Sequence, residues 1–140
     1  MDRSISLELN NEFTIEYIKN RNIVKVICNP KPKEKVRYLI NYSSFKYLLD
    51  LIITFRSKQL SSVDCFIPKL IESKYSSNGN DQVLFTLKRN SKLSTSSIKF
   101  KISRRRNDKK EWKKIYQLKF KNSFEFDDFV DNLTLLTKLK

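Results

Sequence analysis

The feature that most constrains the fold of this chain is a short helical pattern that occurs twice. Residues 44–53 and 125–134 align without a gap at an offset of 81 residues. In both segments apolar residues recur at i, i+3, i+4 and i+7, which is the spacing of one face of an α-helix. Two amphipathic helices of similar design are therefore predicted. The matched pairs are Phe45/Phe126, Leu48/Phe129, Leu49/Val130, Asp50/Asp131 and Ile52/Leu133.

Strand-like segments precede each predicted helix. They alternate apolar with polar residues and are separated by clusters of Asn, Pro and Ser, which favour turns. Ser44 and Ser123 stand where an N-cap hydroxyl would accept a free backbone N–H. The predicted strands lie at residues 4–9, 13–18, 23–28 and 36–41 before the first helix, and at 65–72, 82–88, 97–103 and 112–121 before the second.

The order of four strands and one helix thus occurs twice in a chain of single-domain length. A four-stranded sheet covered by one helix buries little apolar surface alone, whereas two such units can bury their helices against each other. We predict an α+β fold in one domain, residues 1–140, in which pseudo-repeats 4–58 and 62–138 form an intramolecular pseudo-dimer. A second interpretation stays open, because any two amphipathic helices in a small domain can be aligned.

Positive charge is concentrated in one part of the chain. Residues 88–121 contain fourteen Lys and Arg against two acids, Asp108 and Glu111, in a chain whose total net charge is +14. The cations alternate with apolar residues in segments such as Ile98-Lys99-Phe100-Lys101-Ile102, so the two kinds fall on opposite faces of a strand. This pattern favours a folded basic face whose partner is a polyanion, most commonly nucleic acid.

Within that segment, some cations are stronger phosphate candidates than others. Lys99, Lys101, Lys119 and Lys121 oppose the apolar residues of their strands. A face kept only for solubility normally mixes charge signs, and this one does not, although a merely solvated face stays an alternative. Three consecutive arginines, at the tip of a predicted hairpin, can fork onto phosphates or stack on bases. The candidate nucleic-acid-binding residues are Lys99, Lys101, Arg104, Arg105, Arg106, Lys109, Lys110, Trp112, Lys113, Lys114, Lys119 and Lys121.

Trp112 admits two interpretations. It is the one tryptophan of the chain and lies between Lys109-Lys110 and Lys113-Lys114, where its ring would be a stacking platform for an unpaired base. It also has the parity of Tyr116 and Phe120, which would place it over the core at the edge of the strand. The sequence slightly favours the second interpretation.

Enzymatic activity is not predicted. The chain has no histidine, which removes the commonest general base and metal ligand. Its two cysteines, Cys28 and Cys65, lie far apart among apolar residues, so they are expected to be buried free thiols and cannot build a zinc site alone. A single glycine leaves no glycine-rich phosphate loop. No cofactor or metal site is predicted, and a nuclease using scattered acids is the residual alternative.

The order of elements resembles the Whirly and Pur-repeat class of single-stranded nucleic-acid-binding proteins. The resemblance rests on the strand-to-Ser-to-helix junctions at residues 36–55 and 116–136 and spans most of residues 4–138. It implies a unit of four antiparallel strands and a helix, paired as a dimer or as tandem repeats, with bases lying across exposed sheet faces and hairpins. The chain departs from that class in its shortage of glycine.

A pleckstrin-homology-like barrel with a C-terminal helix is the alternative fold. The strands followed by the apolar face of residues 120–136 resemble such a module, which would bind a protein or an anionic lipid head group. The predicted helix at residues 44–55 would then be an insertion between strands of the barrel. One helix plugging one barrel would distinguish this fold from two helices packed between two sheets.

The sequence as a whole predicts a binding protein for single-stranded DNA or RNA, with DNA favoured and little sequence preference, acting in replication, repair or RNA handling. No run of residues reaches the roughly 20 apolar residues of a membrane span. The start Met1-Asp2-Arg3-Ser4 does not resemble a signal peptide. We therefore expect an intracellular protein, cytoplasmic or nuclear, without a membrane partner; a protein partner or self-association is left open.

Overall fold

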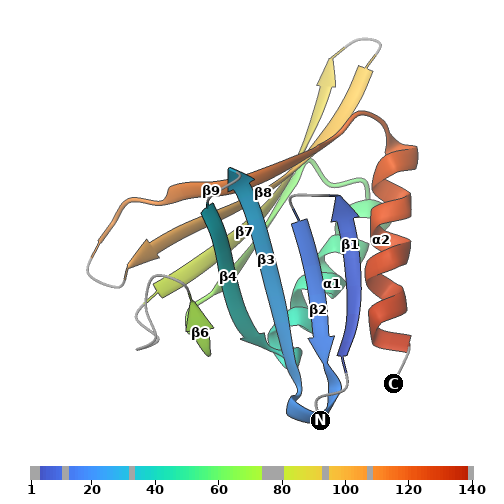
Figure 1. Cartoon of the computed structure of the whole chain (residues 1–140). Coiled ribbons are helices and arrows are strands. Elements are labelled where there is room, and N and C mark those ends of the chain that lie inside the picture. Colours follow the sequence, from blue (N-terminus) through green and yellow to red (C-terminus); the bar gives the residue numbers. More distant parts are fainter. Residues whose placement is uncertain are drawn as a thin grey trace.

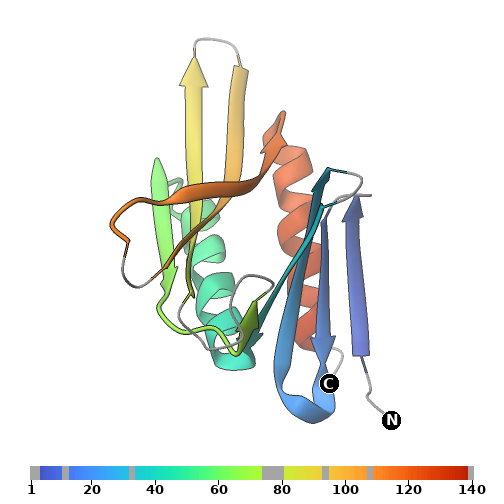
Figure 2. The ribbon, with the colours of Figure 1, turned by 60° about the vertical axis from the view of Figure 1, so that its left-hand side comes forward.

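Two antiparallel β-sheets enclose two α-helices in the computed structural model of the chain (Figures 1 and 2). The structure describes residues 4–10, 13–31, 34–73, 81–92, 95–106 and 109–138. In Figure 2 both helices run through the space between the sheets, so each sheet has an inner face toward the helices and an outer face away from them. The predicted α+β class is confirmed.

The first sheet is a meander that leads directly into a helix. Its strands are β1 (Ser4–Asn10), β2 (Phe13–Ile18), β3 (Ile23–Lys31) and β4 (Glu34–Asn41), and α1 (Tyr42–Ser57) follows without a loop. A single 3-10 turn, η1 (Lys19–Arg21), connects β2 to β3 and ends at Asn22, which has a left-handed backbone (φ 54°) that asparagine tolerates.

The second sheet is built from β5 (Ser62–Ile67), β7 (Asp81–Lys92), β8 (Thr95–Arg106) and β9 (Lys113–Phe120), followed by α2 (Ser123–Lys138). The expected single strand at residues 65–72 is wrong. Pro68 has no N–H for a ladder, so the segment divides into β5 and the short β6 (Glu72–Ser73). β6 crosses over and pairs with β4 at the edge of the first sheet.

The ends of several elements differ from their predicted positions. α1 begins at Tyr42, two residues before Ser44, so Ser44 lies in the first turn and is not an N-cap. Before α2 the capping atom is Asn122 Oδ1, which accepts the backbone N–H of Glu125 at 2.9 Å, so Ser123 is not the N-cap either. β8 continues to Arg106, because its last residues pair with the start of β7.

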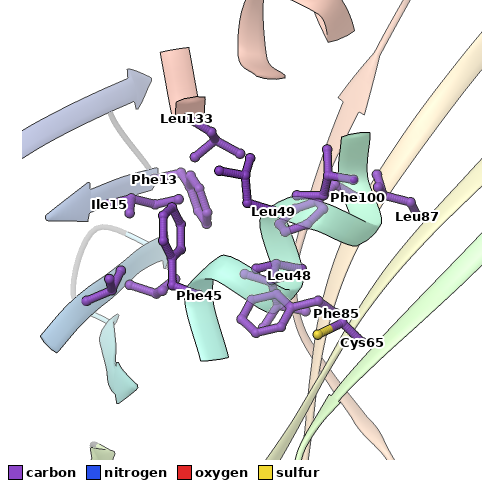
Figure 3. Packing of buried hydrophobic residues seen from close by; sticks show 14 of the residues in the cluster. Phe13, Ile15, Phe45, Leu48, Leu49, Cys65, Phe85, Leu87, Phe100 and Leu133 are labelled. Carbon is purple, nitrogen blue, oxygen red and sulfur yellow. The ribbon is translucent and has the colours of Figure 1, made fainter. Parts of the chain in front are cut away.

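The core lies between the sheets and is shared by both helices. α1 buries Phe45, Leu48, Leu49, Ile52 and Phe55, and α2 buries Phe126, Phe129, Val130, Leu133 and Leu136. These two sets match position by position at the offset of 81 residues, so the predicted helix faces are confirmed. Figure 3 shows the α1 leucines between aromatic rings of the two sheets.

The helices also contact the sheets reciprocally. α1 follows the first sheet and packs against β5 of the second, whereas α2 follows the second sheet and packs against β1 of the first. The helices meet at Phe55 and Phe126, whose rings lie edge to face at 5.7 Å. Arg56 of α1 adds ion pairs to Asp127 and Asp131 of α2 at 3.8 and 3.4 Å.

The alternative of one barrel plugged by a C-terminal helix does not describe this arrangement. The described residues form two separate sheets with two helices between them, which is the outcome that separates the two predicted folds. No helix among the described residues has the length and apolar character that a membrane span requires.

Candidate nucleic-acid interface

Four lysines gather on the outer face of the second sheet. The register pairs Lys88 of β7 with Lys99 of β8, and Lys99 with Lys119 of β9, which sets three cations in a row across neighbouring strands. Lys101 lies two residues along β8, between Thr86 and Gln117. Adjacent strands are about 4.8 Å apart, so these charges are close enough to reinforce one another's potential. We call Lys88, Lys99, Lys101 and Lys119 the lysine face.

The lysine face lacks compensating acids. None of its four lysines makes an ion pair with another residue that the structure describes. Asp64 on β5 is the one acid that the described strands contribute to this outer face, and it lies opposite Thr86. Like charges in adjacent strands destabilise a sheet when they stand directly opposite each other. The positive charge of this row is therefore not compensated by the described residues.

A one-residue bulge decides where Trp112 lies. Ile102 pairs with Tyr116, but the next residue of β8, Ser103, pairs with Lys114, so Ile115 is an extra residue in β9. The extra residue reverses the side-chain alternation before it. Tyr116 and Phe120 therefore enter the core as expected, while Trp112 is displaced to the opposite face. The interpretation of Trp112 as a core residue at the strand edge is wrong.

Trp112 belongs to a cluster with Arg105 and Phe66 on the outer face. The Arg105 guanidinium lies 4.4 Å from the centroid of the indole and 5.8 Å from that of Phe66, and the two rings meet edge to face at 6.0 Å. Arg105 Nε also donates a hydrogen bond to Gln82 Oε1 at 2.7 Å, which fixes the guanidinium. We call Phe66, Arg105 and Trp112 the aromatic cluster. Phe66 is 42 % exposed, so its ring is accessible from the outer face.

A depression of about 340 Å³ opens beside this cluster. Arg105 and Trp112 form part of its wall, together with cations from the end of β8 and the start of β9 and with the carboxylate of Glu111. The lysine face and this depression lie at two ends of β8, separated by Ser103 of β8 and by its partners Leu84 on β7 and Lys114 on β9. Cationic and aromatic side chains thus lie on the same face of the second sheet.

The three arginines predicted at a hairpin tip are not equivalent. They lie within β8 and not in the loop, so the prediction of a tip from Arg104 to Lys110 is wrong for its first three residues. Arg104 lies 4.0 Å from the buried carboxylate of Asp81, which also accepts a 2.5 Å hydrogen bond from Ser73 Oγ. The charge of Arg104 is therefore partly compensated by a buried carboxylate, whereas Arg106 is exposed.

The remaining predicted cations divide by position. Lys109 and Lys110 are exposed in the connection between β8 and β9, and Lys113 and Lys114 are exposed at the start of β9. Lys121 is exposed after β9, and its backbone N–H donates to Glu125 Oε2 at 2.8 Å. Asp108, the second acid of the basic segment, lies outside the described residues. Lys99, Lys101, Arg105, Trp112, Lys114 and Lys119 are the predicted site residues that the sheet brings onto one face.

Sequence reasoning missed two residues of this face. Lys88 was counted in the basic segment but not as a site residue, although its alternation with Leu87 and Phe85 is the same signal that selected Lys99. Phe66 was not selected either. It stands between the buried Cys65 and Ile67, so strict alternation already indicates that its ring faces outward.

The outer face of the first sheet is different. Two of its cations are paired, because Lys25 Nζ lies 3.4 Å from Glu16 Oε1 and Arg37 makes an ion pair with Glu72 of β6. A depression of about 470 Å³ on this face is lined by those same two cations, Lys35 and Glu72. Mixed charge of this kind suits a solvated surface.

Two observations in the described part of the chain concern metal and thiol chemistry. No group of three or more His, Cys, Asp or Glu side chains there could hold a metal ion. Cys28 and Cys65 are buried free thiols, as expected, and burial raises their pKa to about 12 and about 11. Thiols so far from ionisation are poor nucleophiles.

Comparison with protein-family models, curated proteins and solved structures finds no match to this chain.

Proposed function

We propose that this chain binds single-stranded nucleic acid, with DNA favoured over RNA, on the outer face of its second sheet. The observation that carries the proposal is the lysine face: four lysines on three adjacent strands, with no ion pair among the described residues, next to an exposed aromatic cluster on the same face. Contacts to phosphates are independent of sequence, so little sequence preference is expected overall. A role in replication, repair or RNA handling would follow.

The aromatic rings on this face favour a single strand over a duplex. Stacking on Trp112 or Phe66 requires an unpaired base, and each stacked base is worth roughly 1–3 kcal/mol. From Lys99 to Arg105 the strand β8 covers about 20 Å, and cations at the start of β9 extend the basic surface, which suits a single-stranded segment of about six nucleotides. The backbone would cross the lysine face, and the bases would reach the aromatic cluster.

We also propose that the two halves of the chain are an intramolecular pseudo-dimer. The matched buried positions of α1 and α2 support it, as do the reciprocal contacts of α1 with β5 and of α2 with β1. Closed two-fold pairs reuse one surface patch in this reciprocal manner. In this arrangement the binding would be asymmetric, because the outer face of the first sheet carries paired charges.

The test is a fluorescence-anisotropy titration of labelled single-stranded DNA, matched RNA and duplex DNA at two salt concentrations, with Trp112 emission followed in parallel. We expect a preference for single strands, quenching of the indole, and a slope of log K against log salt of roughly −4 if about six phosphates are contacted. Equal, weak binding to all three that salt abolishes would contradict the proposal. It would favour a protein or anionic-lipid partner instead.

A further inference from the structure

The depression beside Trp112 contains a feature that phosphate binding does not require. Glu111 places a carboxylate in its wall among Arg105, Arg106, Lys109 and Lys113. Glu111 makes no ion pair with any residue that the structure describes, although cations surround it. A carboxylate without an ion-pair partner at this point repels a phosphate and attracts a hydrogen-bond donor.

We propose that the depression receives one unpaired base and that Glu111 selects a base with an exocyclic amino group, cytosine before thymine or uracil. This inference rests on the proposed function and concerns its specificity. A carboxylate only accepts hydrogen bonds, and acidic side chains read the N4 amino group of cytosine in this way. Thymine and uracil present a carbonyl oxygen at the same position, which a carboxylate repels.

Among the side chains that line the depression, Glu111 is the one that accepts hydrogen bonds. Gln82 Oε1 already accepts from Arg105 Nε, so this neutral acceptor beside Arg105 is engaged. Arg105 is held against the indole and supplies donors only. A base stacked at Trp112 therefore meets cations that favour its phosphate and one carboxylate able to accept from its edge.

The experiment compares oligo(dC) with oligo(dT) of equal length by anisotropy, at one salt concentration and at neutral pH, where cytosine stays unprotonated. The wild-type chain should bind oligo(dC) about fivefold more tightly, the effect of one modest base-edge contact. Glu111→Ala should bring the ratio of the two Kd values close to one. Its overall affinity should rise, because the variant loses a negative charge.

Asp64→Ala is the matched control. It also removes one exposed acid from the outer face of the second sheet, but Asp64 does not line the depression. Affinity for both oligonucleotides should therefore rise while the ratio stays at its wild-type value. A ratio near one in the wild-type chain, or a preference that persists in Glu111→Ala, would overturn the inference and leave the proposed function standing. Absence of binding to either oligonucleotide would overturn the proposed function itself.

Discussion

The two sheets of this protein have similar inner faces and contrasting outer faces. Inside, each sheet packs against both helices, and each buries one free thiol, Cys28 in the first and Cys65 in the second. Outside, the first sheet pairs Lys25 and Arg37 with Glu16 and Glu72, whereas the second sets four lysines on one face without such partners in its described strands.

The difference arises because folding depends mainly on the inner faces, whereas ligand binding would depend on the outer faces. Burial of apolar side chains dominates folding and depends on the inner faces, so a core shared between the sheets needs similar patterns in both. Outer-face charges contribute little to stability, and exposed ion pairs are typically worth less than 1 kcal/mol. Outer faces are thus free to diverge, and an uncompensated basic face costs some stability that an anionic ligand would recover.

Neutralising the lysine face should remove the difference in charge between the two outer faces and produce the largest change in affinity for single-stranded DNA. A variant with Lys88, Lys99, Lys101 and Lys119 changed to Gln should lose on the order of a hundredfold in affinity for single-stranded DNA at low salt, and its salt slope should become less steep by about 3. The matched control removes the same charge from the first half through Arg21, Lys25, Lys35 and Arg37. Equal weakening in both variants would show that net charge, and not this face, determines binding.

The aromatic cluster should contribute a smaller effect that is independent of salt. Trp112→Ala should reduce affinity about tenfold while leaving the salt slope unchanged, because stacking involves no counterion release. Anisotropy titrations at two salt concentrations measure both quantities. Tyr47→Ala, which removes an exposed ring from α1, is the control and should leave both unchanged.

The inner faces should respond alike to alkaline pH. Burial raises the pKa of Cys28 from 9.0 to about 12 and that of Cys65 to about 11, so the stabilising effect of the protonated thiols is complete below pH 9 and is lost as pH rises through those values. One unit above pH 9, each thiol should lower the free energy of unfolding by about 1 kcal/mol. Urea denaturation of the wild type and of Cys28→Ala/Cys65→Ala isolates this effect, because lysine titration is common to both. Parallel pH profiles would contradict it.

Removing the acids of the first sheet should give the smallest change and make the two outer faces more alike. Glu16→Gln/Glu72→Gln releases Lys25 and Arg37 from their ion pairs, and we expect a gain in affinity of about threefold at low salt. Asp50→Asn/Asp128→Asn removes two exposed acids from the helices and controls for net charge. A gain of the same size in that control would show that local unpairing is irrelevant.

Much of the fold was predictable because it depends on local alternation. The helices around Phe45 and Phe126, the order of the strands and the buried parity of Phe100 and Tyr116 all follow from periodicity along the chain. The outward direction of Lys99, Lys101 and Lys119 follows from the same signal and is confirmed by the register of β8 with β9.

The remaining features of the fold and of the candidate site depend on a bulge, a crossover and ion pairs, which the periodic pattern of the sequence does not show. The extra residue Ile115 reverses the alternation and moves Trp112 to the outer face, and a bulge has no clear signature in a strand of mixed residues. The crossover of β6 to the first sheet is a tertiary pairing of two residues. The ion pairs of Lys25 and Arg37 join side chains on separate strands, so the partial charge compensation of that face appears only once the strands are in register.

The most direct test of the account maps backbone amide chemical shifts while unlabelled single-stranded DNA is added to isotope-labelled protein. We predict changes concentrated on β7, β8 and β9 around the lysine face and the aromatic cluster, with the first sheet almost unaffected. Changes centred on the first sheet or on the exposed sides of the helices, or no changes at saturating DNA, would contradict the claim that the second sheet binds nucleic acid.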